Sequence, residues 1–501
     1  MNVQELLRSS GWGTVQSRQA PGGAEVREKR RRIVTMKGKI IAPFLFLLFC
    51  AAAWPQSASS NSAKEATPAQ IPYANMPAAA VPYARYRKPY FEWYVRPNTV
   101  AYYGAARSVP DPKLSMLKTV NIGFLGPIGK GDPNAIYGVP MLHGAQMAID
   151  DANARGGYHG KPFSLKVHDD LPLWGASSMD IVKMYYNQHV WAMLGSINGD
   201  NTHVELRAAL KLELPIIDTA TTDPTVTATR IQWLIDNFPD DRQQGYALAD
   251  YIFNQLKLRN VGILRVNDNY GRRGYDEFFR DARRMGFQPV VVMKYPPGAE
   301  SFTEQLHTLK LLHIGGLVIW GNAHEAGLIL KQMRAMGMNQ PVFGSSRVAY
   351  PEVVKIAGAA ANGLVAISAI DPASKSQKWL AFRREYMARY HAEPDAYAAH
   401  AYDGMTMLIA AIQKVGLNRA LIMDALRQYE MKSYQGVSGT AFFDYTLNNI
   451  APVTFAKVVN GHFVYWPERR TDWKGTSGGI PVVSAVNSPL REQGASMAPG
   501  H

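Results

Sequence analysis

The strongest constraint on the fold is a regular alternation of short apolar runs and helical stretches, which starts at Thr119. Residues 119–126 form an apolar run that ends in glycine, and from Gly138 to Arg155 apolar residues recur at helical spacing. Because parallel strands need a helical crossover between them, this alternation predicts an α/β fold with parallel sheets covered by helices. Further strands are predicted at 163–168, 191–194, 215–218, 260–266, 289–294, 316–320 and 364–367.

The alternating region spans about 350 residues, which exceeds a comfortable single core and therefore predicts two lobes. Two long helices are expected at 379–391 and 397–415, and a closing hairpin is expected from 451–458 with 462–466. We assign residues to the lobes as follows: lobe 1 takes 119–239 plus 371–448, and lobe 2 takes 240–370 plus 449–467.

The chain before this region begins with a segment typical of export. Residues 40–53 form an apolar run behind Lys37 and Lys39, too short for a membrane span of about 20 residues and followed by small residues suited to cleavage. Residues 1–58 are therefore predicted to be an extension and signal segment, with Met36 as an alternative start, and the mature protein is expected to be periplasmic or otherwise extracytoplasmic. A lipid anchor at Cys50, the single cysteine, is a disfavoured alternative because Phe49 precedes it.

Two segments outside the alternating region have the composition of connections. Residues 59–118 are rich in Pro, Ala and Tyr without a strand or helix period, which predicts a linker or a wrap-around arm. Its aromatic residues keep open the alternative of a partner-docking segment. Residues 468–501 are rich in Gly, Pro and Ser, and we expect them to be disordered.

The net charge of +14 raises the question of nucleic-acid binding. Most of this charge lies at the ends of the chain, with about +6 in residues 1–39 and about +5 in 60–118. Only about +2 remains in 119–467, where no basic stripe occurs. A surface that follows phosphates needs clustered Lys and Arg, so this distribution argues against a nucleic-acid partner.

The motifs of several enzyme classes fail on inspection. The glycine-rich loop 126–131 lacks the ending of a P-loop and the spacing of a dinucleotide fingerprint, and the histidines show no metal-binding spacing. Asp169 and Asp170 are neighbours on a strand, so their side chains point to opposite faces, and we expect one to cap a helix and the other to be solvated. The Gly-x-Ser-x-Gly pattern at 475–479 has no strand before it and no helix after it. We therefore predict no enzyme activity, no metal and no cofactor.

The order and spacing of several short motifs resemble the leucine/isoleucine/valine-binding family from about Thr119 to Trp466. The matching motifs are Ile122–Pro127, Tyr137–Gly138, Gly144–Ala145, Ala148–Gly157, Asp169–Asp170, Ala192–Gly195, Pro215–Pro224, Gln244–Gly245 and Asn269–Gly271. The resemblance implies a type I periplasmic-binding-protein fold, with two doubly wound lobes joined by a three-stranded hinge. It also implies a solute-binding protein that carries an amino acid or a related small carboxylate or amide to the permease of an ABC importer.

Two other function classes stay open at this point. The same fold serves as the ligand-receiving part of sensory receptors, which would need a separate signalling partner here. An enzyme on a two-lobed scaffold is the third class, and the absence of a catalytic motif argues against it.

The resemblance also implies a ligand site in the cleft between the lobes. Gly199, Ala220, Thr221 and Thr222 match positions where the first lobe grips an amino-acid head group, and Tyr137 matches a position that lines the cleft. Thr222 could instead be a turn hydroxyl that satisfies nearby backbone. Tyr270 matches a tyrosine of the second lobe that closes over the ligand, and its alternative is a capping aromatic residue on a core helix.

Departures from the family pattern concern the same cleft. Gly199 stands where the family often has serine, with Ser196, Asn198 and Asp200 nearby as substitutes. Ser346 stands where the family has the acid that accepts the ligand's ammonium group, and Arg347 beside it would favour an anionic group. The alternative for Arg347 is that its side chain points to solvent. In place of the family's second-lobe aromatic residue the chain offers Trp320 and Asn322.

Overall fold

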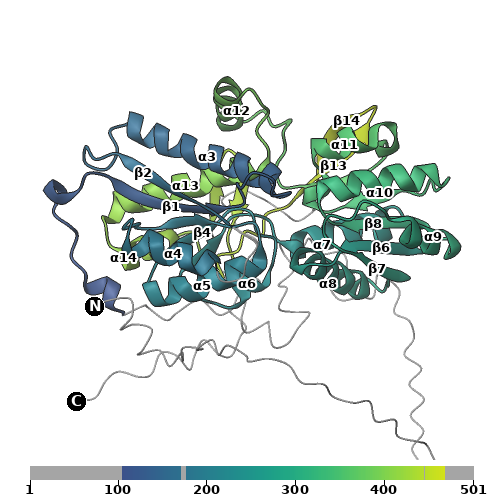
Figure 1. Ribbon diagram of the computed structural model, residues 1–501, viewed down its shortest axis with the longest axis horizontal. Coiled ribbons are helices and arrows are strands. Elements are labelled where there is room, and N and C mark those ends of the chain that lie inside the picture. The colour runs from purple at the N-terminus through teal and green to yellow at the C-terminus, as the bar shows by residue number, and fades with distance from the viewer. Residues whose placement is uncertain (1–103, 171–175, 431, 445, 469–501) are drawn as a thin grey trace, which may run out of the picture. The chain divides into compact units, whose positions relative to one another are not determined.

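Two sheets with helices packed on them form the part of the chain described by the computed structural model, which covers residues 104–170, 176–430, 432–444 and 446–468 (Figure 1). The predicted signal segment, Cys50, Met36, most of the segment 59–118 and nearly all of 468–501 lie outside the described residues. We use lobe 1 and lobe 2 for the elements around the first and second sheet.

Lobe 1 is built on a five-stranded sheet in which every pair of neighbouring strands is parallel, in the order β2-β1-β3-β4-β5. Helices α3 and α13 pack on each other, as do α4 and α5, and the two pairs cover opposite faces of the sheet (Figure 1). The strands are β1 (Val120–Gly126), β2 (Phe163–Asp169), β3 (Met193–Gly195), β4 (Ile216–Asp218) and β5 (Leu234–Asp236). The helices are α3 (Ala135–Ala154), α4 (Ala176–Tyr186), α5 (Gly199–Leu212), α6 (Thr225–Ala228), α12 (Gln377–Tyr390), α13 (Ala396–Val415) and α14 (Arg419–Arg427).

Lobe 2 is built on a seven-stranded sheet in the order β14-β13-β10-β9-β8-β6-β7, parallel except for the last two strands of the chain, which form an antiparallel edge. Its strands are β6 (Val261–Val266), β7 (Val291–Tyr295), β8 (Gly316–Trp320), β9 (Val342–Gly344), β10 (Val365–Ser368), β13 (Thr454–Val459) and β14 (His462–Pro467). Its helices are α7 (Asp241–Ala249), continued by a π-helical turn at Asp250–Gln255, then α8 (Asn269–Arg284), α9 (Thr303–Leu311), α10 (Ala323–Ala335) and α11 (Pro351–Ala357). Short 3-10 turns lie at Ser346–Val348 and Gly358–Ala361.

The apolar runs of the sequence become strands that are buried on both faces, as parallel strands between helix layers must be. All five residues of β8 are buried, and only Asn121 in β1 is partly exposed. This burial holds the carboxyl ends of the strands in fixed positions, and the loops that follow these ends form the site described below.

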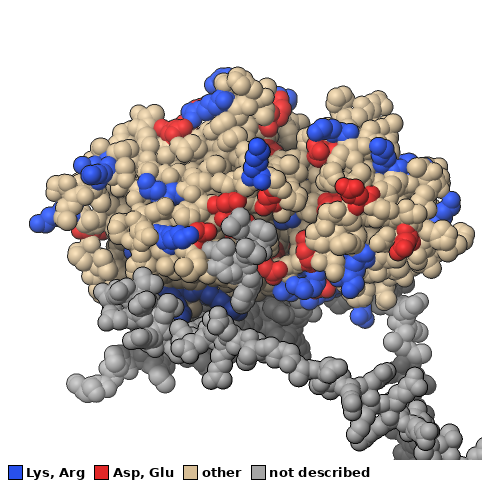
Figure 2. All heavy atoms as spheres, viewed as in Figure 1, with Lys and Arg blue, Asp and Glu red and all other residues tan. Residues whose placement is uncertain are grey.

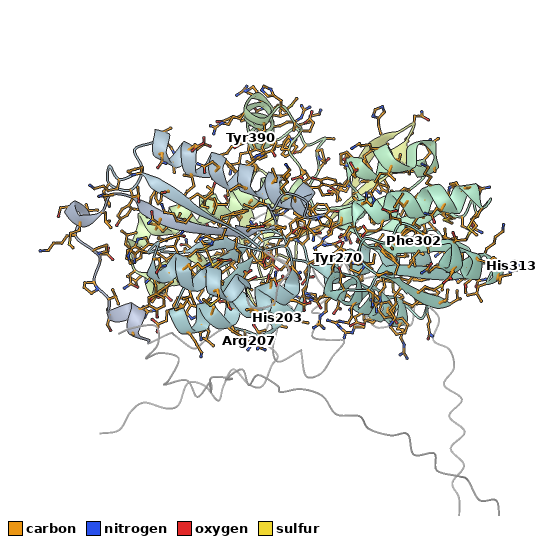
Figure 3. The ribbon with its side chains drawn as sticks, in the orientation of Figure 1. His203, Arg207, Tyr270, Phe302, His313 and Tyr390 are labelled. Atoms are coloured by element: carbon orange, nitrogen blue, oxygen red, sulfur yellow. The ribbon has the colours of Figure 1, made fainter. Side chains whose placement is uncertain are left out.

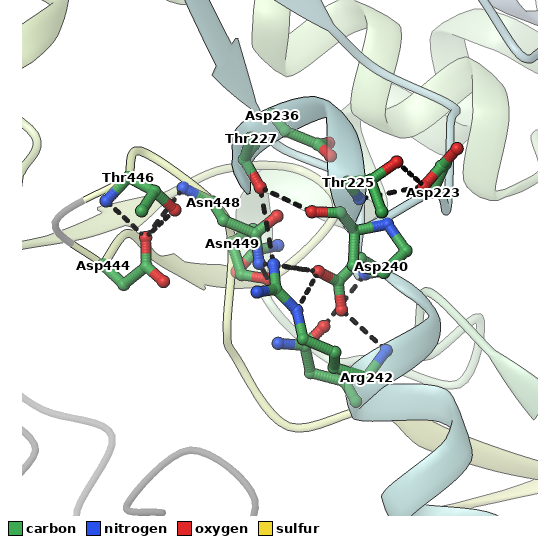
Figure 4. A network of polar contacts seen from close by, with 12 residues as sticks. Asp223, Thr225, Thr227, Asp236, Asp240, Arg242, Asp444, Thr446, Asn448 and Asn449 are labelled. Carbon is green, nitrogen blue, oxygen red and sulfur yellow. Dashed lines mark hydrogen bonds and ion pairs between the residues drawn. The ribbon is translucent and has the colours of Figure 1, made fainter. Parts of the chain in front are cut away.

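Three segments cross between the lobes, after β5, after β10 and before β13. The first and third crossings lie side by side, because the backbone N–H of Asn449 donates to the carbonyl of Asp236 at 2.9 Å. Figure 4 shows the buried polar network that joins them. In it the Arg242 Nε donates to Asp240 Oδ2 at 2.7 Å, and the Asn448 amide donates to the same carboxylate at 3.1 Å. The hinge is therefore built around a buried ion pair.

Most predicted elements are present, with boundaries shifted by one to three residues; β8 matches the prediction at both ends. The missed strands are β5, β9, β11 (Ser433–Gln435) and β12 (Thr440–Phe442), each three residues long. Three residues are too few to show a strand period, and this length does not separate the missed strands from β3 and β4, which are equally short and were predicted.

Residues 104–118 form an arm that packs on lobe 1, through 3-10 turns at Ala105–Ser108 and Leu114–Met116. The Asn418 side-chain amide donates to the carbonyls of Ala106 and Val109 at 2.8 Å each, and Arg107 forms an ion pair with Asp424 at 2.5 Å. These contacts hold the described end of the segment 59–118 on lobe 1.

The surface of the described residues carries charges of both signs. Figure 2 shows Lys and Arg side chains interspersed with Asp and Glu across the described part of the face it draws, with no continuous basic stripe there. Within the described ranges, no single helix is long and apolar enough to cross a membrane. Helices α13 and α14 meet that test only when taken together, with a bend of 117° between them.

Candidate functional site

The two sheets each have one point where the strand order reverses, between β1 and β3 in lobe 1 and between β6 and β8 in lobe 2. In open α/β sheets, ligands bind outside the carboxyl ends of the strands at such points. Asn198 follows β3, whereas Tyr270 follows β6 and Asn322 follows β8. Figure 3 shows Tyr270 where lobe 2 meets lobe 1. The predicted site residues therefore come from both reversal points.

Tyr137 on α3 is one of the lobe 1 residues that hydrogen-bond directly to lobe 2. Its hydroxyl accepts from the backbone N–H of Ala323 at 3.0 Å and donates to the carbonyl of Arg347 at 3.5 Å. Its fully buried ring packs edge-on against Tyr350, with 5.1 Å between ring centroids, and tilted against Tyr397 at 5.0 Å. Burial is the main cause that raises the pKa of Tyr137. Its hydroxyl therefore stays protonated and can act as donor and acceptor.

Arg347 is buried between the lobes, with only 4% of the residue exposed, so the alternative that it points to solvent is wrong. One terminal nitrogen donates to Asn322 Oδ1 at 2.9 Å, and the other donates to the carbonyl of Ile197 in lobe 1 at 3.1 Å. The guanidinium carbon lies 3.8 Å from the ring centroid of Tyr270 and 5.6 Å from that of Tyr137. Arg347 is thus a cation of lobe 2 that reaches lobe 1.

Ser346 precedes Arg347 in the sequence, and the Tyr270 ring lies against its guanidinium. The backbone N–H of Ser346 donates to Gln244 Oε1 at 2.9 Å, while its hydroxyl is buried without a hydrogen-bond partner among the described residues. The Tyr270 hydroxyl donates to Ser345 Oγ at 2.7 Å. Its ring face therefore stays available to the guanidinium, and Tyr270 does more than cap its helix.

The threonine loop after β4 has a more local hydrogen-bonding pattern than the resemblance implies. The backbone N–H groups of Ala220 and Thr221 donate to Asp218 Oδ1 at 3.0 and 2.9 Å. The Thr222 carbonyl accepts from the N–H of Asp241 at 2.8 Å. Burial raises the pKa of Asp218 to about 7. These two N–H groups are taken by Asp218 and are therefore not available to a ligand on this loop.

Gly199 and Asn198 occupy the start of α5. Asn198 caps the helix, with its Oδ1 accepting from the N–H of Asp200 at 3.2 Å. A Cβ atom on Gly199 would lie 2.6 Å from Asp223 Cβ and 2.9 Å from Asn269 Nδ2, closer than real contacts allow. Glycine is therefore required here because side chains of the two lobes meet directly over it.

Asp223 and Asn269 form one polar contact between the lobes. The Asn269 amide donates to Asp223 Oδ2 at 2.9 Å, and Arg273 Nε lies 3.4 Å from the same oxygen. His203 Nε2 lies 3.7 Å from it on the lobe 1 side. We call this set the Asp223 seam. Sequence reasoning missed its role, although Asp223 lies inside one of the motifs that carried the resemblance.

Tyr350 and Asp395 form a second polar contact between the lobes. The Tyr350 hydroxyl donates to Asp395 and lies 2.7 Å from the carbonyl of Ile136. Asp395 also caps α13 by accepting from the N–H of Ala398 at 2.8 Å. Burial is the main cause that raises the pKa of Asp395 to about 6. Nothing in the local sequence around either residue predicted this contact.

Trp320 is the last residue of β8, and Asn322 follows two positions later. Their side chains lie in different environments. The Trp320 ring is fully buried against α8, where a Cβ on Gly274 would meet its Nε1 at 1.7 Å, and its ring centroid lies 6.5 Å from that of Phe278. Asn322 precedes α10 and holds the Arg347 guanidinium. The structure thus brings Asn322 to the cation and places Trp320 in the core of lobe 2.

The expectation for Asp169 and Asp170 is wrong. Asp169 Oδ1 accepts from the N–H groups of Ile128 and Gly129 at 2.9 Å each, so it closes the glycine-rich loop instead of capping a helix. Asp170 is buried, bonds Ser196, and accepts from the Asn201 amide at 2.6 Å. Both carboxylates serve the loops at the carboxyl end of the first sheet.

A search of the described residues finds no group of three or more His, Cys, Asp or Glu side chains that could hold a metal ion. The buried acids near β2, β3 and β4 include Glu205, whose pKa is raised well above its usual value, chiefly by burial and then by Asp170 and Asp218. The arrangement is that of a hydrogen-bonding site with one buried cation.

The sequence of this chain is similar to that of known binding proteins. A family model described as periplasmic binding protein matches residues 119–462. Leu/Ile/Val-binding protein homolog 1 of Brucella suis biovar 1 (strain 1330) is 25% identical over 289 residues, which cover 57% of this chain and 76% of the relative. An amino acid binding protein of Pseudomonas aeruginosa PAO1 is 25% identical over 321 residues, which cover 63% of this chain and 83% of the relative.

Solved structures agree with these matches. The branched-chain amino acid transporter substrate-binding protein LivJ from Streptococcus pneumoniae, in complex with isoleucine, has a TM-score of 0.64 at 26% identity, covering 70% of this chain and 99% of that one. A solute-binding protein from R. palustris in complex with benzoate shares the fold, with a TM-score of 0.63 at 16% identity, covering 70% and 96%. These structures confirm the predicted two-lobed α/β fold. Because the family model spans residues 119–462, which is more than half of the sequence, the chain belongs to the periplasmic binding protein family, a family of extracytoplasmic solute-binding proteins.

Proposed function

We propose that this protein captures a small solute between its two lobes, an amino acid or a related small carboxylate or amide, and delivers it to the permease of an ABC importer. The observation that carries the proposal is the pair of hydrogen bonds from Tyr137 of lobe 1 to Ala323 and Arg347 of lobe 2. A ligand bound among these residues would touch both lobes, so it would stabilise the closed arrangement by its differential affinity for it. The names of LivJ and of the Brucella relative support the solute class.

Isothermal titration calorimetry of the full chain against single amino acids, small carboxylates and small amides tests the capture step. We expect one class to bind with 1:1 stoichiometry and to raise the midpoint of thermal unfolding, as mass action requires for a ligand of the folded state. Chemical conversion of a bound ligand, seen by mass spectrometry after long incubation, would contradict the binding-protein reading.

Cross-linking in membranes of the source organism, with and without the ligand found by titration, tests the delivery step. Recovery of an ABC permease supports import, whereas recovery of a signalling receptor supports the alternative of a ligand-sensing component. Fractionation of the same cells tests the export expected from residues 40–53, and comparison with a Cys50→Ala variant tests the lipid anchor.

A further inference from the structure

The contact region between the lobes contains a buried cation, Arg347, that has no carboxylate as a direct partner among the described residues. Both terminal nitrogens of Arg347 donate to neutral oxygens, and Asp268 acts on its charge without a direct hydrogen bond among the described residues. Its Nε is buried and has no hydrogen-bond partner. The hydroxyl of the preceding residue, Ser346, is also buried without a partner.

Such an arrangement is unfavourable unless something else supplies the missing interactions. A buried charge is tolerated when it is paired and hydrogen-bonded, and arginine presents a planar fork of donors that matches a carboxylate. The Tyr270 and Tyr137 rings flank the guanidinium and help to hold it in place. The fork is thus oriented, incompletely bonded and located between the two lobes.

We propose that the cleft recognises the carboxylate of a small molecule that has no ammonium group, with Arg347 as the residue that binds it. This inference rests on the function proposed above and narrows its ligand class. The carboxylate would take the free Nε and one terminal nitrogen of Arg347, with the Ser346 hydroxyl as a further donor. The neutral acceptors Asn322 and Ile197 would keep the guanidinium in its present orientation.

Asp241, whose charge acts on Tyr270, is a buried carboxylate near this cation, but burial raises its pKa well above the usual value and so favours the neutral form, which attracts an ammonium group poorly. Asp268 acts on the charge of Arg347, and Glu325 acts on Tyr137. Asp268 caps α8 through the N–H of Gly271 at 2.8 Å, and Glu325 accepts from the N–H of Gly298 at 3.0 Å. Each already has a structural partner, and a second cation close to Arg347 would be repelled. The aromatic rings around Tyr137 favour an apolar body for the ligand.

Three probes of one shape separate the charges that the cleft accepts. 4-Methylpentanoate carries only the carboxylate, leucinamide carries only the ammonium group, and L-leucine carries both. Benzoate and benzamide form a second pair with a planar body. We expect calorimetry on the full chain to show that 4-methylpentanoate binds at least tenfold more tightly than leucine, and that benzoate binds more tightly than benzamide. Leucinamide should not bind.

Variants of Arg347 test the residue itself. Arg347→Met should weaken carboxylate binding by about a hundredfold or more, whereas Arg347→Lys should keep part of the affinity because it keeps the charge without the fork. The unfolding midpoint of Arg347→Met without ligand should not fall, since the variant removes a buried charge that lacks an anionic partner. Arg383→Met is the matched control, because Arg383 is exposed and pairs with Glu393 at the surface.

The outcomes show whether the carboxylate inference alone fails or whether the proposed solute capture fails with it. Tighter binding of leucine or leucinamide than of 4-methylpentanoate would overturn the inference and leave solute capture in place. Unchanged carboxylate affinity in a folded Arg347→Met variant would do the same. If no probe of any class binds to the wild-type chain, both the inference and the proposed function fail.

Discussion

A methyl group added at Gly199 tests whether the lobes close against each other through the Asp223 seam. In Gly199→Ala the new Cβ would lie 2.6 Å from Asp223 Cβ, 2.7 Å from Asp223 Oδ2 and 2.9 Å from Asn269 Nδ2. Gly199 is the first residue of α5, where alanine is the better helix former by about 1 kcal/mol. The substitution therefore favours the helix of lobe 1 and disturbs the contact between the lobes.

The expected magnitude follows from the hydrogen bond that is displaced. The Asn269 amide donates to a carboxylate at 2.9 Å, and hydrogen bonds to charged groups contribute about 1.5–3 kcal/mol. Loss of this contribution in the closed form shifts the closed-to-open ratio by about tenfold to about a hundredfold. Apparent ligand affinity should fall by a similar factor when the open form predominates without ligand, because the binding-competent fraction is then proportional to the closed-to-open ratio.

Pulsed electron paramagnetic resonance between one label on each lobe measures this shift directly. Met179 on α4 and Leu311 on α9 are 56% and 65% exposed, so cysteines there can carry labels in a Cys50→Ser background. Gly315→Ala is the control, because its Cβ would meet only Asn260 O at an ordinary 3.6 Å. We expect Gly199→Ala to show a larger fraction of long interlobe distances. Identical distance distributions for both variants and the parent would refute the reasoning.

Three further predictions concern buried acids and the arm. Because ionised Asp395 costs the folded state about 3 kcal/mol, given a pKa raised from 3.8 to about 6, wild-type stability should fall relative to Asp395→Asn as the pH rises from about 4 through 6. Denaturant titrations at pH 4.5 and 7.5 measure the difference in unfolding free energy between wild type and Asp395→Asn. A difference that does not change with pH would contradict this prediction. Glu205→Gln should raise the unfolding midpoint more at pH 8 than at pH 5, since burial raises the pKa of Glu205 and the wild-type carboxylate ionises with rising pH; a lower midpoint at both pH values would count against this. Asn418→Asp keeps the cap of α14 but loses the amide that binds the arm, so hydrogen exchange at Val109 and protease cleavage after Arg107 should accelerate by about five- to thirtyfold; rates equal to wild type would show that the arm is held elsewhere.

The alternation of apolar runs and helices was enough to predict the layered sheets, because long buried strands and helices leave a periodic pattern in the sequence. β5 and β9 were missed although β3 and β4, which are equally short, were predicted, because three residues leave little pattern and pairing is decided by neighbours distant in the chain. The small hairpin of β11 and β12 was missed for the same reason.

The site was predicted in outline, and its details depend on contacts between distant residues. Ser346 and Arg347 stood out in the sequence because they depart from the family pattern. The sequence left open where the Arg347 side chain points, and the structure shows that it is buried. The contact of Tyr350 with Asp395 spans 45 positions, and that of Asn269 with Asp223 spans 46. Neither pair shares a local motif, so only the packing of the two lobes brings them together.

The arm at residues 104–118 determines which half of the molecule can act as the fixed frame. Its bonds run to Asn418 and Asp424, both on lobe 1, so the described chain starts on that lobe. Any attachment made by the upstream chain would then hold lobe 1 still. Lobe 2 would carry the motion of opening and closing, together with Arg347, toward a stationary partner.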